Sequence, residues 1–382
     1  MTSMPWESEK LYHDADLYFY DLLAAIKDAK ESITLESFIF ARDLLGMKIC
    51  QALCEAAQRG VQVRLLIDGV GSSHWFSSFY AFVKDLPLEV RFYHPLPWHP
   101  KPLSSCLIKY MTHYLLGLEW INKRNHRKAC VIDSKYAFVG SFNITTDHLR
   151  SIGPKAPWRD SGIKLRGQQV KDISLAFERA WLKFPSLAKK RSVVKRLHNF
   201  QRRTSLVRLN DTPQMRKLYH KDLILRLKYA TTRIWITNPY FVPDARMIEL
   251  LQEAQARGVD VRLILPELSD MSLFPWINSW AARKLAKSGV KIYYYKERIL
   301  HAKIVIIDEW SMLGSSNLNS RSLLHDLEMD IVLSSSKTRE ELKNQFLLDQ
   351  QSSELQIYEA IIKRYWSKNL FFPFLRLIRY WI

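Results

Sequence analysis

Histidine, lysine and aspartate recur at one spacing in two places along the 382-residue chain. Both copies read His-x-Lys-x-x-x-x-Asp and are followed by Gly-Ser-x-Asn. An imidazole can attack phosphorus or transfer a proton, while an ammonium group and a carboxamide can hold a phosphoryl group. The pattern therefore predicts phosphoryl transfer without a metal or another cofactor. Its members are His126, Lys128, Asp133 and Asn143 in the first copy and His301, Lys303, Asp308 and Asn317 in the second.

The apolar residues after each lysine predict a short buried strand. Residues two apart on a strand share a face, so His126 and Lys128 should project together, and the second copy should repeat this. The aspartate follows its histidine by seven residues, an odd offset, and cannot share that face. Because aspartate is favoured in turns, we expect Asp133 and Asp308 to close a hairpin and to support the site indirectly.

The returning strand of each hairpin should bring Asn143 beside His126, and Asn317 beside His301. The preceding Gly-Ser residues are small enough to let backbone amides approach a ligand. If the two copies dock about a pseudo-two-fold axis, two lysines and two asparagines could cradle one phosphoryl group. One imidazole could then attack phosphorus while the other protonates the leaving oxygen.

A longer repeat surrounds these motifs. Segments 55–68 and 253–266 match at eight of fourteen positions, and each is typical of a helix end, a glycine turn and an apolar strand. Another apolar strand is predicted upstream of each, at 31–40 and 231–241. The chain should therefore be α/β, with two tandem repeats, each a mixed sheet flanked by helices, and the active site at their interface.

The two halves differ in length. The motif histidines are 175 residues apart, whereas the repeat glycines Gly60 and Gly258 are 198 apart, so the first half carries about 23 extra residues. A stretch at 183–208 with nine basic residues and no acidic one joins the halves. We predict a first repeat at 13–186 with an insert at 96–123, a basic linker at 187–209, a second repeat at 210–345 and an amphipathic tail at 346–382.

Composition narrows the choice of partner. The formal net charge is +19, which favours a polyanion, either nucleic acid or an anionic membrane surface. The 12 tryptophans and 17 tyrosines favour the lipid–water interface. No run reaches the roughly 18 apolar residues that a membrane span needs, and the N-terminus lacks a signal-peptide pattern. Cys50 and Cys54 are one helical turn apart, which suits half a metal site or, more simply, thiols on a buried helix face.

These motifs resemble the phospholipase D superfamily, and within it the bacterial cardiolipin synthases of the short form without N-terminal transmembrane helices. The resemblance spans roughly residues 13–345. It is carried by NHRKACVID followed by GSFNI, by NPYFVPD (238–244) and by GSSNLNSRSLLHDLE (314–328). It implies two phospholipase D-type repeats around a shared cleft and transphosphatidylation through a phosphohistidine. Gly-Ser stands at 140–141 where such synthases often have Gly-Gly.

The resemblance also implies roles for single residues. An acidic residue after each asparagine orients the opposite imidazole, and the matching positions here are Asp160 and Glu328. By the same analogy His126 is expected to be the nucleophile and His301 the general acid and base. His148 and His325, which follow the two motifs, are expected to be structural.

The flanking sequence distinguishes substrates that the motifs cannot. In the tail, residues 374, 377, 378, 381 and 382 form an apolar helical stripe beside two arginines, which suits either a membrane interface or a helix docked on the core. The insert suits membrane contact, and the basic linker suits lipid headgroups or nucleic-acid phosphates. We expect a peripheral enzyme on the cytoplasmic side of the inner membrane.

The preferred reaction is the joining of two phospholipids, with two phosphatidylglycerols giving cardiolipin and glycerol. A phospholipase D-type hydrolase or another phosphatidyltransferase is the alternative, and a nuclease is a distant one. Nucleic acid is not expected as a partner, and the sequence leaves the oligomeric state open.

Overall fold

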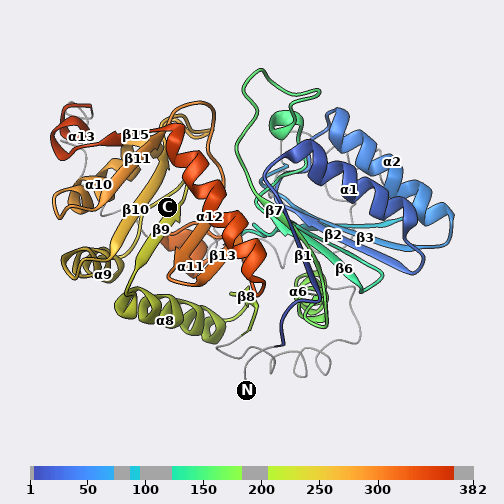
Figure 1. Ribbon diagram of the computed structural model, residues 1–382. Helices are drawn as coiled ribbons and strands as arrows, with labels where there is room; N and C mark the ends of the chain where they lie inside the picture. Colours follow the sequence, from blue (N-terminus) through green and yellow to red (C-terminus); the bar gives the residue numbers. More distant parts are fainter. Residues whose placement is uncertain (1–3, 73–86, 95–122, 183–204, 365–382) are drawn as a thin grey trace, which may run out of the picture.

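The computed structural model describes residues 4–72, 87–94, 123–182 and 205–364. Nearly all of the predicted insert, the basic linker up to residue 204, and the tail from residue 365 lie outside the described residues. Figure 1 shows two α/β halves side by side, each built on one sheet.

The first half holds a seven-stranded mixed sheet in the order β1-β7-β6-β5-β2-β3-β4. The helices α1 and α2 cover one of its faces and α6 lies against the other (Figure 1). The elements are β1 (Ser8–Tyr12), α1 (Ala15–Asp28), β2 (Ser32–Ser37), α2 (Leu44–Gln58), β3 (Gln62–Asp68), β4 (Glu89–Tyr93), β5 (Ala129–Ile132), β6 (Tyr136–Gly140), the 3₁₀ turn η2 (Thr146–His148), β7 (Gly162–Arg166) and α6 (Val170–Leu182).

The second half holds an eight-stranded mixed sheet in the order β15-β11-β10-β9-β12-β13-β14-β8. Its elements are β8 (Val207–Leu209), α8 (Pro213–Tyr229), β9 (Arg233–Thr237), α9 (Ala245–Ala256), β10 (Asp260–Pro266), α10 (Phe274–Ala286), β11 (Lys291–Tyr295), β12 (Ile304–Ile307), β13 (Trp310–Gly314), α11 (Ser320–Leu324), β14 (Met329–Val332), α12 (Ser336–Gln351), β15 (Ser353–Gln356) and α13 (Tyr358–Arg364).

The sequence repeat folds as the same unit in both halves. In each half, a strand, a helix and a parallel strand lie next to a hairpin: β2-α2-β3 beside β5-β6, and β9-α9-β10 beside β12-β13. Gly60 and Gly258 end the helices with φ of 90° and 87°, a left-handed conformation that glycine adopts without strain. The predicted α/β class with two tandem mixed sheets is confirmed.

Several boundaries differ in position from the predicted domain limits. The first sheet begins with β1, ahead of residue 13, and β15 pairs with β11 from within the predicted tail. Within the predicted linker, β8 pairs with β14, and Arg208 on β8 is buried with its Nη1 2.7 Å from Asp222 Oδ2. Arg208 therefore forms a buried ion pair with Asp222 in the second half, and it adds nothing to a basic surface.

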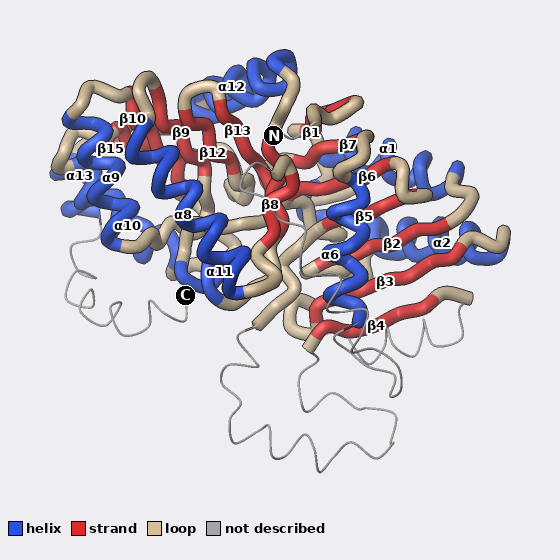
Figure 2. The backbone as a smooth tube through the Cα atoms, turned by 90° about the horizontal axis from the view of Figure 1, so that it is seen from below, coloured by secondary structure: helices blue, strands red, loops and turns tan. Residues whose placement is uncertain are grey.

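The two halves share a hydrophobic core. Val131 and Val139 from the first hairpin belong to the same buried cluster as Ile304 and Leu313 from the second. The opposite face of each sheet packs on that half's own helices, with Cys50 buried on α2 and Cys54 half-buried beside it. The seven-stranded and eight-stranded sheets thus dock through their hairpins (Figure 2), which brings the ends that precede β5 and β12 to the shared boundary. Among the described helices, none is long and apolar enough to cross a membrane.

Candidate active site

The motif histidines lie at the boundary between the halves, one from each side. Each stands just before its strand rather than in it, since β5 begins at residue 129 and β12 at residue 304. The backbone N–H of His126 donates to the Leu327 carbonyl at 3.0 Å, and that of His301 donates to the Arg159 carbonyl at 2.8 Å. Each histidine segment is therefore held by a segment of the other half.

The side chains repeat this crossing. His126 Nδ1 lies 3.1 Å from both carboxylate oxygens of Glu328, and His301 Nδ1 lies 2.7 Å from Asp160 Oδ2. All four groups are buried. Because Nδ1 of each ring faces a carboxylate oxygen, it carries the proton, and Nε2 is left for chemistry. The structure therefore brings each imidazole together with the acidic residue that the resemblance implied for it.

Hydroxyl groups hold both carboxylates in place. Ser141 donates to Asp160, and at the matching position Ser315 donates to Glu328. A second hydroxyl, that of Ser322, donates to Glu328 Oε1 at 2.6 Å. These hydrogen bonds orient each carboxylate toward its imidazole.

His148 takes the place of Ser322 in the first half. The backbone N–H of Asn143 donates to His148 Nε2 at 3.2 Å, just as that of Asn317 donates to Ser322 Oγ at 3.2 Å. His148 Nδ1 is 3.6 Å from Asp160 Oδ2, so two imidazoles face one carboxylate in the first half. His325 is not its counterpart, because it caps the end of α11.

Both motif lysines are buried beside their histidines. Lys128 Nζ donates to the His126 carbonyl at 2.7 Å and Lys303 Nζ to the His301 carbonyl at 2.5 Å. Burial lowers the pKa of Lys128 to about 7 and that of Lys303 to about 8, and the positive charge of Lys303 contributes to the shift at Lys128. The two ammonium groups thus lie close enough to repel, and an anion between them would relieve the repulsion.

The asparagines are also buried in the site. Asn143 Oδ1 accepts a long hydrogen bond of 3.4 Å from the Ile39 N–H, while Asn317 Oδ1 is buried without a hydrogen-bond partner among the described residues. A buried amide oxygen without a hydrogen-bond donor costs free energy. A ligand that supplies a donor is therefore favoured there.

Asp133 and Asp308 lie at the opposite ends of their strands from the histidines. Both close the hairpin turns, with φ of 51°, as expected for aspartate in a tight turn. Asp133 accepts from the backbone N–H groups of residues 30–32 at 2.7–3.2 Å, and Asp308 accepts from those of residues 231–233 at 2.8–3.3 Å. The structure does not bring these two carboxylates to the imidazoles.

Charge differs between the two imidazole–carboxylate pairs. Burial lowers the pKa of His126 well below its usual value, helped by the charges of Lys128 and Lys303. Burial also lowers the pKa of His301, but the Asp160 charge opposes that shift. The pKa of Asp160 is itself depressed by His301, whereas burial raises the pKa of Glu328 to about 6. The His301–Asp160 pair is thus the better one for holding a positive charge.

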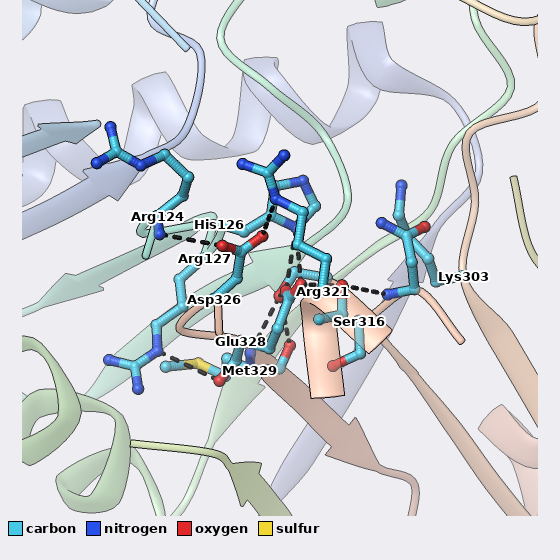
Figure 3. Close-up of polar contacts among 12 residues, drawn as sticks. Arg124, His126, Arg127, Lys303, Ser316, Arg321, Asp326, Glu328 and Met329 are labelled. Atoms are coloured by element: carbon cyan, nitrogen blue, oxygen red, sulfur yellow. Dashed lines mark hydrogen bonds and ion pairs between the residues drawn. The ribbon is translucent and has the colours of Figure 1, made fainter. Parts of the chain in front are cut away.

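A buried network of charges adjoins His126. Figure 3 shows Asp326 between Arg124 and Arg321, close to Glu328. The Asp326 carboxylate accepts from the backbone N–H of Arg124 at 3.0 Å and from the side-chain Nε of Arg321 at 3.1 Å. Burial and the neighbouring Glu328 charge raise the pKa of Asp326 to about 7. Aromatic rings lie beside both imidazoles. The ring centroid of Phe38 is 4.9 Å from that of His126, and the ring centroid of Trp158 is 5.4 Å from that of His301.

Sequence reasoning missed the positioning roles of Ser141, Ser315, Ser322 and His148. A signal for the first two was present, because serine follows glycine in both Gly-Ser-x-Asn copies. No such signal marked the pair of His148 and Ser322, since the two residue types differ although both lie five residues after the motif asparagine.

Comparisons with known proteins show the family of the chain. The family model described as cardiolipin synthase, PLD-like domain, matches residues 22–153 and 223–349. Cardiolipin synthase B of Salmonella typhi is 32% identical over 332 residues, covering 85% of this chain and 76% of that protein. Cardiolipin synthase 1 of Bacillus cereus is 29% identical over 380 residues, covering 97% of this chain and 71% of that protein.

A solved structure shows the same fold at much lower identity. The phosphatidylserine synthase of Haemophilus influenzae superposes with a TM-score of 0.69 at 13% identity, covering 100% of this chain and 96% of that one. The chain belongs to the family of cardiolipin synthase, PLD-like domains. The predicted family and the predicted class, a phosphatidyltransferase of the phospholipase D type, are confirmed at that level.

Proposed function

We propose that the chain transfers a phosphatidyl group between two phospholipids, with two phosphatidylglycerols giving cardiolipin and glycerol. Membership of the cardiolipin synthase, PLD-like domain family supports this choice of reaction, as do the relatives named cardiolipin synthase. The reaction breaks one phosphodiester bond and forms another in its place. It therefore needs acid–base and nucleophilic groups and a site for a phosphoryl group.

The observation that carries the mechanism is the pair of imidazole–carboxylate contacts across the two halves. Each carboxylate accepts the Nδ1 proton of the opposite ring, which leaves both Nε2 atoms for the substrate in this proposal. Two rings in one site allow one to act on phosphorus and the other on the oxygen that leaves or enters. Neither half could do this alone, because each lacks the carboxylate for its own histidine.

We assign the nucleophile to His126 and the proton transfers to His301. His126 is the more strongly held in its neutral form, which is the form that has a lone pair for attack. His301 faces an ionised Asp160, which stabilises the imidazolium that an acid–base catalyst must form.

The steps then balance in protons and bonds. His126 Nε2 attacks phosphorus, the bond from phosphorus to the glycerol oxygen breaks, and His301 gives that oxygen its proton. The hydroxyl of a second phosphatidylglycerol next transfers its proton to His301 and attacks phosphorus, which breaks the bond to His126. Lys128, Lys303, Asn143 and Asn317 hold the non-bridging oxygens in both steps.

We also propose that the chain works at the surface of an anionic membrane, on the cytoplasmic side of the inner membrane. Its substrates are lipids in this proposal, and its net charge of +19 is attracted to anionic headgroups.

The test uses the purified chain with phosphatidylglycerol vesicles and mass spectrometry of the lipids. We expect cardiolipin and free glycerol in many turnovers from the wild type. From His301→Ala we expect no cardiolipin and at most one glycerol per chain, which is released when a His126 adduct forms. Phosphatidic acid as the sole product would make water the acceptor and the chain a hydrolase. Accumulation of a phosphatidyl adduct on His126 in His301→Ala, with none in His126→Ala, is the expected result for the two roles. An adduct on His301 in the His126→Ala variant would reverse them.

A further inference from the structure

A cavity of about 560 Å³ is lined by residues of both halves. Leu327 lines this cavity, while its neighbour Glu328 turns the other way and contacts His126. None of the motif histidines, lysines or asparagines is among the described residues that line it. The described residues of the cavity wall are therefore distinct from those of the proposed phosphoryl cradle.

The cavity walls carry an excess of positive charge. Lys123 enters from the first half, and Arg216 and Lys217 enter from α8 of the second. The two acidic side chains of the wall are already engaged. Asp211 pairs with Arg127 and Arg179, and Asp244 caps α9 and lies 3.2 Å from His220.

Arg216 stands out among these cations. Its Nη2 donates to the His325 carbonyl at 3.1 Å, but its Nη1 is buried and has no hydrogen-bond partner among the described residues. A buried guanidinium N–H without an acceptor costs free energy, and an anionic oxygen in the cavity would satisfy it. Burial also lowers the pKa of Arg216, an effect that a bound anion would oppose.

Part of the remaining wall is apolar, although Ser320, His220 and His325 also line it. Leu323, Leu324 and Leu327 line the cavity together with the ring of Tyr93. Leu324 is 50% exposed, so its side chain is accessible to a ligand in the cavity. Cations beside this apolar side chain suit a molecule with an anionic head and an apolar chain, and they suit a free inorganic ion less well.

We propose that this cavity binds the phosphate headgroup of an anionic lipid at a site distinct from the catalytic one, with Arg216 and Lys217 on the phosphate and Leu324 against the apolar chain. The proposal goes beyond the transfer reaction and does not depend on it, since binding requires no bond to break. Lipid held here would anchor the boundary between the halves to the anionic surface from which substrates come.

The probe is dodecyl phosphate below its micelle concentration, titrated calorimetrically into the full chain. It is a monoester without a phosphatidyl group to donate. The Lys128→Ala/Lys303→Ala variant lacks the proposed cradle, so any binding that this variant retains occurs at another site. We expect this variant to bind the probe. A triple variant that also carries Arg216→Gln should bind the probe about tenfold or more weakly. Lys217→Ala, an exposed position that does not threaten folding, should weaken it a few-fold.

Lys228→Ala is the matched control, because it removes the same charge from the exposed far end of the same helix. If Arg216→Gln and Lys217→Ala bind the probe as Lys228→Ala does, the site is not at this cavity. If the double lysine variant does not fold, the titration is made in the otherwise unchanged chain, where Arg216→Gln should remove one of two classes of binding. A single class, unaltered by Arg216→Gln, would overturn the proposal.

Two further titrations identify the source of the phosphate. Leu324→Asn removes the apolar contact without adding charge, so it should weaken binding of dodecyl phosphate and leave that of inorganic phosphate unchanged. Inorganic phosphate that binds as tightly as the probe, with no effect of Leu324→Asn, would make the ligand free phosphate and overturn the lipid assignment. Equal binding of the uncharged dodecyl maltoside would show that charge plays no part and would overturn the site as argued.

Discussion

At the scale of single residues, two imidazole–carboxylate contacts set the chemistry of the site. Each carboxylate fixes the proton of its ring on Nδ1 and stabilises the imidazolium form if the ring takes a proton. Because Asp160 is ionised more readily than Glu328, the two contacts are not equivalent despite their matching geometry.

A substitution that removes one carboxylate charge but keeps the shape of the side chain should therefore lower kcat strongly. We expect Glu328→Gln and Asp160→Asn each to lower kcat by on the order of 10²-fold or more, because the rings lose their oriented partner. Steady-state transfer assays measure this. Glu249→Gln, on the exposed face of α9, is the control and should be silent. Near-normal kcat in both active-site variants would remove the carboxylates from the mechanism.

The buried lysines predict a fall in activity at alkaline pH. Lys128 and Lys303 have pKa values near 7 and 8, so the positive charge that holds phosphate disappears as the pH rises through that range. On the acid side, Glu328 takes a proton as the pH falls through about 6 and ceases to be an anionic acceptor. The plot of kcat/KM against pH should be a bell between these limits.

Arginine stays protonated over this range, so Lys128→Arg or Lys303→Arg should move the alkaline limb upward even if the maximum is lower. An alkaline limb that stays in place in both variants would assign it to another group.

At the scale of elements, the hairpins β5-β6 and β12-β13 position the reactive side chains, and the motif aspartates hold the hairpin turns. Asp133 joins its turn to the start of β2, and Asp308 joins its turn to the start of β9. This arrangement explains the odd spacing of aspartate in the motif, because the carboxylate serves the far end of the strand.

We therefore expect Asp133→Ala to act on stability. Loss of several hydrogen bonds and a positive φ that alanine tolerates poorly should cost about 1–3 kcal/mol, as measured by urea unfolding. Asp133→Asn keeps an acceptor oxygen and tolerates the turn, so it should cost less. In the folded fraction kcat should stay near that of the wild type. A loss of kcat by orders of magnitude in stably folded Asp133→Asn would instead give this carboxylate a direct part in catalysis.

At the scale of the whole molecule, activity depends on how the two halves dock. Arg159 precedes Asp160 in the first half and forms two hydrogen bonds of 2.8 Å with Asp349 on α12 of the second half. Both side chains are buried. This ion pair joins the second half to the segment that holds Asp160, the carboxylate that contacts His301.

Breaking that pair from one side should destabilise the fold strongly. Asp349→Leu leaves Arg159 buried without its anion, and we expect a loss of about 3–5 kcal/mol in urea unfolding. Arg159→Leu/Asp349→Leu removes both charges and should regain part of that loss. If the loss of stability in the double variant equals the sum of the losses in the two single variants, the two side chains are not coupled across the boundary.

The sequence by itself determined the local parts of this protein. Spacing along the chain was enough to predict the repeat, the mixed sheets, the two hairpins and the turn positions of Asp133 and Asp308, because strand periodicity and turn preference act between near neighbours. The resemblance of the motifs supplied Asp160 and Glu328 as candidates for orienting the imidazoles.

Only the tertiary structure decided which groups meet. His126 and Glu328 are 202 residues apart, and His301 and Asp160 are 141 apart, so their contacts depend on how two sheets pack through their hairpins. The same packing places Ser322 and His148 in matching positions despite their different chemistry, and it forms the basic cavity at the boundary. Such contacts follow from shape and burial across both halves, which no periodicity within one half encodes.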